Sequence, residues 1–96
     1  MSLIISSRNT NKSTQNLSAD GSYAVPNGTV IDCIKLLPSA DMAAVKVGTT
    51  PGGEEILPAQ PLTGGQASLI GTLITSGTTI YFTGITAGVQ VTFFKK

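Results

Sequence analysis

Few residues of this chain could do chemistry, and their spacing argues against catalysis. The segment Gly48-Thr49-Thr50-Pro51-Gly52-Gly53-Glu54 places two glycines, Gly48 and Gly53, at the spacing of a phosphate-binding loop. At the next position Glu54 stands where that motif needs a lysine to reach the phosphates, and no helix pattern follows. We therefore interpret the segment as a glycine-rich turn between two strands.

Acid–base and nucleophilic chemistry are disfavoured in the same way. Glu54 and Glu55 are adjacent, so in a strand their side chains point to opposite faces and cannot serve one substrate as acid and base. The chain has no histidine, so its many hydroxyls lack the commonest activating base. Asp20, Asp32 and Asp41 do not have the spacing of a calcium loop. The sequence predicts a protein that is not an enzyme and holds no cofactor or metal.

Carbohydrate binding is the alternative function that the side chains allow. Sugar-binding β-sandwich modules use exposed aromatic rings, and this chain has two tyrosines, three phenylalanines and no tryptophan. Alternation assigns Phe82 and Phe93 to an inner face. This leaves Tyr23 and Tyr81 as candidate interaction residues, to which Phe94 could add a third ring. Tyrosines on strands also pack across neighbouring strands. The two interpretations differ in whether Tyr23 and Tyr81 lie together on an exposed face.

Charge and cysteine content limit the classes of partner. The 96 residues carry a net charge of +1 and only 11% charged side chains, against about 25% in typical domains. The six basic residues are scattered, so the sequence predicts no nucleic-acid surface. Lys95 and Lys96 are expected to form a solvated tail that protects the last strand, and the lone Cys33 a small buried side chain. Neither a signal peptide nor a membrane span is indicated, so we expect synthesis in the cytoplasm.

Strands must position these residues. Short β-rich runs punctuated by Gly and Pro predict one all-β domain, an antiparallel β-sandwich of jelly-roll or Greek-key type with about seven or eight strands. Asn27-Gly28 predicts a type I′ hairpin turn, and residues 58–65 an extended crossover. The expected strands are Val30–Leu37, Ala43–Gly48, Glu54–Leu57, Ala67–Thr75, Thr78–Thr83 and Val89–Phe94, with weaker ones near Leu3 and Tyr23.

The first twenty residues differ in composition from the rest. Residues 1–20 are mostly polar and cannot enclose a core, so we expect an N-terminal arm followed by a sandwich domain over residues 21–96. The arm begins with the apolar triplet Leu3, Ile4 and Ile5. We expect these three residues to form an interaction segment that adds to the edge of a neighbouring sheet.

Two runs, Ile31–Leu37 and Leu69–Ile74, carry large aliphatic side chains at both odd and even positions. A small sandwich buries only one face of each sheet, so the surplus needs a cover. The N-terminal arm or a neighbouring subunit could supply it, and the sparse charge favours association. We expect a homo-oligomer, with a trimer as the expected form.

Three segments, Val45–Ile56, Gly77–Ile85 and Val89–Phe93, resemble small β-sandwich virion proteins of tailed bacteriophages. The likeness is to accessory capsid, head-decoration or head-fibre proteins of phages that infect gut Bacteroidetes. It covers about Val30–Phe94 and lies in turn chemistry and strand pattern. The resemblance implies a non-enzymatic structural protein of the virion, often trimeric, that binds the major capsid protein or another virion protein. It implies no catalytic residues and has no counterpart of the arm.

Overall fold

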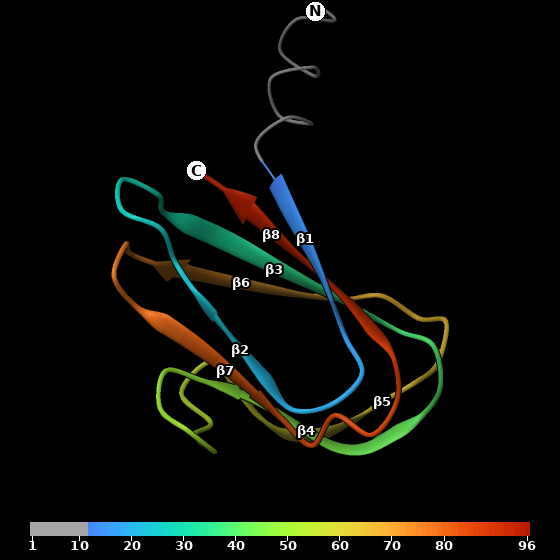
Figure 1. Ribbon diagram of the computed structural model, residues 1–96. Coiled ribbons are helices and arrows are strands. Elements are labelled where there is room, and N and C mark those ends of the chain that lie inside the picture. Colours follow the sequence, from blue (N-terminus) through green and yellow to red (C-terminus); the bar gives the residue numbers. More distant parts are fainter. Residues whose placement is uncertain (1–11) are drawn as a thin grey trace, which may run out of the picture.

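The computed structural model describes residues 12–96, and these form eight β-strands and no helix (Figure 1). No helix in this part of the chain could therefore cross a membrane. The expected strand near Leu3 lies outside the described residues. The strands are β1 (Lys12–Leu17), β2 (Gly21–Ala24), β3 (Ile31–Pro38), β4 (Met42–Gly48), β5 (Leu57–Leu62), β6 (Ser68–Ile74), β7 (Thr79–Thr83) and β8 (Val89–Lys95).

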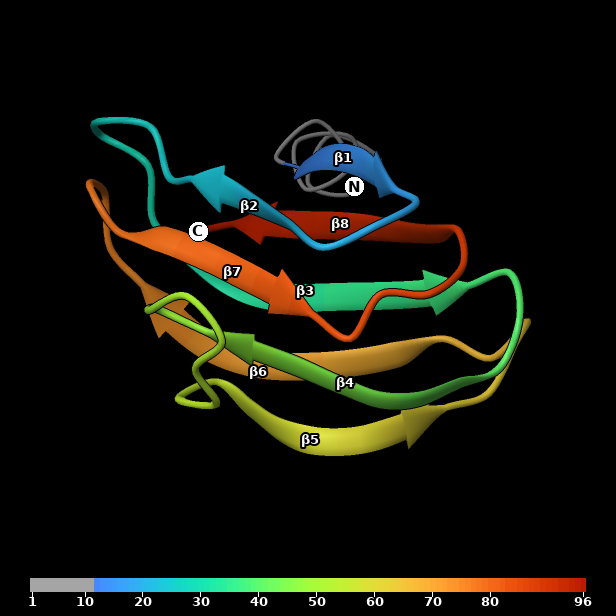
Figure 2. The same cartoon turned by 60° about the horizontal axis from the view of Figure 1, so that its bottom comes forward.

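The strands make two antiparallel sheets of four. Sheet A has the order β1-β8-β3-β6 and sheet B the order β2-β7-β4-β5. The first half of the chain pairs with the second half in reverse, β1 with β8, β2 with β7, β3 with β6 and β4 with β5. This long ribbon turns back between β4 and β5 and wraps into two layers, which adds the β3–β8 and β4–β7 pairs (Figure 2). The arrangement is a jelly roll, as predicted.

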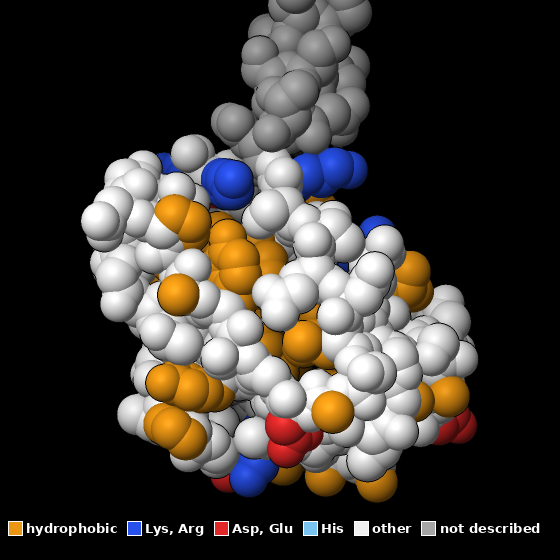
Figure 3. Space-filling view, in the orientation of Figure 1, with side chains coloured by type: hydrophobic (Ala, Val, Ile, Leu, Met, Phe, Trp, Pro, Cys, Tyr) orange, Lys and Arg blue, Asp and Glu red, His pale blue; other side chains and the backbone are white. Residues whose placement is uncertain are grey.

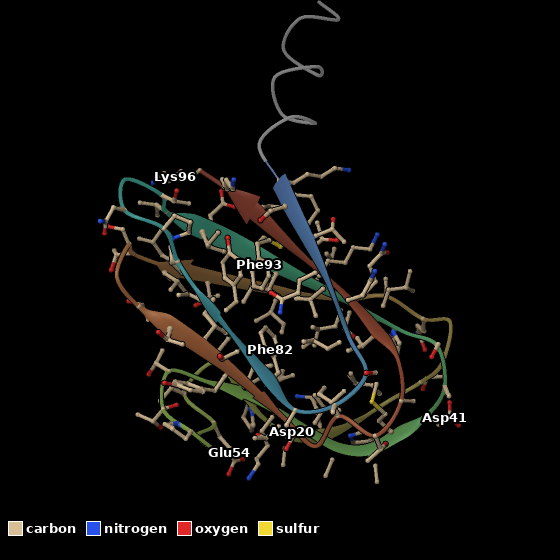
Figure 4. The ribbon with its side chains drawn as sticks, viewed as in Figure 1. Asp20, Asp41, Glu54, Phe82, Phe93 and Lys96 are labelled. Atoms are coloured by element: carbon tan, nitrogen blue, oxygen red, sulfur yellow. The ribbon has the colours of Figure 1, made fainter. Side chains whose placement is uncertain are left out.

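The core lies between the two sheets and follows the alternation seen in the sequence. Ile80 and Phe82 on β7 are buried, and so are Val91 and Phe93 on β8. The rings of Phe82 and Phe93 meet edge to face with centroids 6.1 Å apart, which joins sheet B to sheet A (Figure 4). Such a contact adds about 0.5–1.5 kcal/mol to the burial of two aromatic side chains.

Thr92 is a buried polar residue on the outward-facing side of β8. It lies on the outer face of sheet A, yet only 7% of it is exposed. Its neighbours across the sheet are Thr14 on β1 and Lys35 on β3. A central strand is flanked on both sides, so its outward side chains are covered by those of its neighbours.

The turn at Asn27-Gly28 has a different geometry from the predicted type I′ hairpin. The Pro26 carbonyl accepts a hydrogen bond from the Thr29 N–H at 3.1 Å. Gly28 has φ 79°, whereas no described residue other than glycine has positive φ, so Asn27 keeps a negative φ. That combination belongs to a type II turn. The turn carries the chain from β2 in sheet B to β3 in sheet A.

Two segments that the sequence did not assign to strands are edge strands. β1 lies within the expected arm of residues 1–20, and β5 replaces both the expected strand Glu54–Leu57 and the expected crossover over residues 58–65. β1 has one apolar residue, Leu17, which packs against the core. β5 contains two prolines. Prolines are typical of an irregular segment, but edge strands also accept them. The sandwich therefore includes β1, which precedes residue 21.

Candidate functional site

Four of the five carboxylates accept hydrogen bonds from backbone amides, three of them in the connections between strands and one in β5. Such bonds satisfy N–H groups that would otherwise depend on water. These side chains therefore hold the fold together and do not converge on a common site. The pairs are Asp20 with the N–H of Ile85 at 2.9 Å, Asp41 with Gly64 at 2.8 Å, Glu54 with Ala59 at 2.8 Å and Glu55 with Thr49 at 2.9 Å.

The glycine-rich segment that follows β4 is a turn, as predicted, and its own carboxylate fills it. Glu55 accepts the Thr49 N–H and, at 2.9 Å, the Thr50 hydroxyl. Its own backbone amide, the Thr50 hydroxyl and the Thr49 amide together lower the pKa of the Glu55 carboxyl below its ordinary value. Gly52 takes the positive φ of 73° that the turn requires. A phosphate would meet a carboxylate here.

The tyrosines chosen as candidate interaction residues lie on opposite faces of sheet B. Tyr23 points inward, where its ring stacks on Phe93 with centroids 4.0 Å apart and planes 14° apart. Its hydroxyl lies 3.4 Å from the Ser13 hydroxyl on β1. Tyr81 points outward, because its neighbours on β7 are buried. The two rings therefore do not form one sugar-binding platform.

Lys95 and Lys96 do not protect an edge strand, because the strand that they end is not at an edge. β8 lies between β1 and β3, and the Lys96 N–H donates to the Val30 carbonyl at 2.8 Å. Lys12 lies opposite Phe94, so lysines gather at the end of the molecule where the described chain begins (Figure 3). The expected protection of a last strand does not apply, because the wrapping makes that strand central.

The outer face of sheet A is apolar at β6. Leu69 and Leu73 are 69% and 62% exposed, while Ile74 on the same strand is buried in the core. Between them no atom lies within 4 Å of the point where a side chain at Gly71 would begin. Cys33, expected to be buried, is half-buried on β3 opposite Gly71. β6 therefore carries apolar side chains on both faces, as the sequence indicates for Leu69–Ile74.

Of the four sheet edges that residues 12–96 form, three are protected against pairing with another chain. β2 has only four residues, and β1 is polar and tied to it by the Ser13–Tyr23 contact. On β5, Pro58 and Pro61 have no N–H, and Glu54 occupies the N–H of Ala59. Short strands, charged side chains such as Lys12 on β1, prolines and occupied amides are the devices that block edge-to-edge association.

The fourth edge, β6, has none of these devices. Its sequence, SLIGTLI, contains neither a charge nor a proline. Exposure alternates regularly along its length, with Leu69, Gly71 and Leu73 on the outer side. The ladder to β3 has a register shift at the Ile74 end. We call the unpaired side of β6, together with its outward-facing residues Leu69, Gly71 and Leu73, the β6 edge. It is the candidate interaction site.

A pocket of about 620 Å³ lies at the end of sheet A where β1 and β3 end and β8 begins. Leu17, Leu37 and Val89 contribute apolar walls, and the remaining lining is Pro, Gly, Ser, Asn and Gln. No titratable side chain lines it. Over residues 12–96 no three His, Cys, Asp or Glu side chains gather as metal ligands. The pocket offers shape and hydrogen bonds but no acid–base group.

Comparison with known proteins gives a structural neighbour but no family for this chain. No family model and no curated protein matches this chain. A similar solved structure is the solution NMR structure of a de novo designed double-stranded beta-helix, with 9% identity and a TM-score of 0.42. The match covers 88% of this chain and 97% of the designed one. It carries no argument about function, which must come from the sites.

Proposed function

We propose that this chain is a non-enzymatic structural protein of a phage particle, an auxiliary capsid, head-decoration or head-fibre component that self-associates. Its partner is the major capsid protein or another virion protein, and its location is the virion. The observation that carries the proposal is the β6 edge, an unblocked strand with two exposed leucines on a chain whose other edges are blocked. Strand edges of this kind pair with other chains.

The remaining chemistry of the described residues supports a structural role. The carboxylates of Asp20, Asp41, Glu54 and Glu55 are engaged with backbone amides, so they are not poised over a substrate. The pocket of sheet A offers no general acid or base. Jelly rolls serve as viral capsid domains and also as lectin domains, and this analogy of fold is compatible with both candidate functions.

The carbohydrate-binding alternative receives no support from the aromatic residues. Tyr23 is stacked inside the sandwich on Phe93, which leaves Tyr81 alone on the outer face of sheet B. One tyrosine without a second ring gives a sugar little to stack on. A virion protein needs no such platform.

Mass spectrometry of density-purified phage particles from the source culture tests the proposal. We expect this chain in fixed stoichiometry with the major capsid protein, and its release together with fragments of the shell. A chain that stays in the soluble fraction while particles lack it would overturn the proposal. Glycan-array binding by the purified chain that Tyr81→Ala abolishes would favour the carbohydrate-binding alternative.

A further inference from the structure

We infer that two copies of this chain associate by antiparallel pairing of their β6 strands, related by a two-fold axis at Gly71. The inference rests on the self-association in the proposed function and specifies its contact. The two A sheets then join at the β6 edges into one continuous sheet of eight strands. The main-chain groups on the free side of β6 find partners, and the exposed leucines lose part of their contact with water.

The occupant of the β6 edge is a second copy because the edge is self-complementary. Leu69 and Leu73 lie at equal distances along the strand on either side of Gly71. A two-fold axis at Gly71 places Leu69 of one copy opposite Leu73 of the other, and the converse pair forms on the other side of the axis. All four leucines then lie on one face of the joined sheet. A two-fold contact of this kind is closed and uses the same patch on both copies.

The register follows from the same residues. A pairing centred on Ile70 would place Leu69 opposite Gly71 and leave Leu73 beyond the partner's leucines. A pairing centred on Thr72 would do the reverse. A centre on Leu69 or on Leu73 would pair one leucine of each copy with its counterpart and leave the other without a leucine opposite. Only the Gly71 centre places both leucines of each copy opposite a leucine, and cross-strand apolar pairs on one face fix a register.

Nothing on the strand opposes this contact. Ser68–Ile74 carries no charge, so the pairing brings no like charges together. The space above Gly71 is open, so the two strands meet at the axis without side chains in the way. The charged side chains of β3 are Asp32, at the register shift, and Lys35, opposite Leu69, and both stay one strand away from the interface in each copy.

The contact predicts a dimer, whereas the sequence-based expectation is a trimer. A two-fold axis cannot generate a species of three chains. Sedimentation velocity on the full chain therefore separates the two, because the β6 pairing gives a species of twice the 9.8 kDa chain mass. The dimer should weaken on dilution, as expected for a modest interface.

Two variants at the same two positions test both the surface and the register. The L69K/L73K variant places like charges opposite each other across the interface, so we expect it to weaken the dimer by about a hundredfold or more. The L69K/L73E variant loses the same leucines, yet its two pairs are of opposite charge. Positions 69 and 73 lie about 13 Å apart along one strand, so attraction within a copy is small. We expect this variant to recover most of the dimer.

A control and three further outcomes complete the test. The control A43K/Q60K adds two lysines at exposed positions of sheet B and should sediment as the wild type does. Equal thermal melts of all variants show that the fold is intact. A wild type that remains monomeric at high concentration would overturn both the β6 pairing and the self-association in the proposed function.

An oligomer that L69K/L73K leaves unchanged would overturn the β6 pairing alone. Self-association would then proceed through another surface, and the proposed function would stand. A trimeric wild type has the same consequence for the pairing. If L69K/L73K and L69K/L73E are both monomeric to the same degree, the Gly71-centred register is wrong.

Discussion

β5 and β6 are the two strand edges on one side of the jelly roll, one in each sheet, and they are built in opposite ways. On β5, two prolines remove backbone donors and Glu54 takes the amide of Ala59. On β6 no proline, charge or side-chain acceptor interferes, and two leucines are exposed. Both strands come after the turn between β4 and β5, as consecutive strands of the chain. The difference therefore lies in their own residues and not in where they stand in the chain.

The comparison shows that this sequence contains the means to block an edge and does not use them at β6. The prolines and the glutamate that protect β5 lie in or beside an exposed strand, where they cost little folding stability. Unblocked edges with apolar side chains lead to association in water. Under the proposed β6 pairing, the open edge beside the blocked one is the side of the molecule that makes the contact.

The largest expected effect comes from making a second open edge. Deletion of residues 1–20 removes β1, exposes β8 as an edge, and takes away the contacts of Leu17 with the core and of Ser13 with Tyr23. We expect a loss of more than about 3 kcal/mol in the free energy of unfolding. Denaturant titration measures it.

Deletion of residues 1–11 is the matched control. It leaves β1 whole and should change the free energy of unfolding by less than about 1 kcal/mol. If it also abolishes oligomers, Leu3, Ile4 and Ile5 are the interaction segment that the sequence predicts. A Δ1–20 chain as stable as the full chain would show that β1 is dispensable.

The two faces of β6 should respond differently to truncation. Ile74 faces the core and Leu73 faces solvent. We expect Ile74→Ala to lower the free energy of unfolding by about 2–4 kcal/mol. Leu73→Ala, measured at a concentration where the chain is monomeric, should change it by less than about 0.5 kcal/mol. Comparable losses for both would mean that the outer face of β6 is already covered within one copy.

Removing the protection of β5 should make it resemble β6. The E54A/P58A/P61A variant frees the Ala59 amide and restores two backbone donors. Loss of one exposed hydrogen bond costs about 1 kcal/mol of stability. The larger change is in association, because light scattering at high concentration should rise above that of the wild type. E54A alone, which keeps the prolines, should scatter less than the triple variant; equal scattering would assign the protection to Glu54.

The smallest expected effect is at Glu55, in the turn that leads into β5. Folding lowers the pKa of this carboxyl below the ordinary value of 4.5. Its stabilising contribution is therefore present above 4.5 and is lost as the pH falls through the folded-state pKa. We expect the wild type to exceed Glu55→Gln in thermal stability at neutral pH and the difference to vanish in acid. A difference that grows on acidification contradicts the assigned hydrogen bonds.

The sequence by itself determined the all-β class and the strands that have an apolar and a polar face. Alternation located β7 and β8 and their inward residues, because one face of such a strand must be buried. The same reasoning missed β1 and β5. An edge strand contributes little to the core, so it can consist of polar residues or contain prolines. Such a strand has no alternation of apolar and polar residues by which the sequence could locate it.

The surplus of aliphatics in Leu69–Ile74 was also readable from the sequence, as was the need for something to cover it. Only the tertiary structure decided that β6 is an edge and that β8, the last strand, is central. Strand order depends on how the ribbon of paired strands wraps, and that wrapping is set by contacts between residues far apart in the chain. For this reason the sequence indicates that an apolar face exists, while the structure assigns it to Leu69 and Leu73 beside an unblocked backbone.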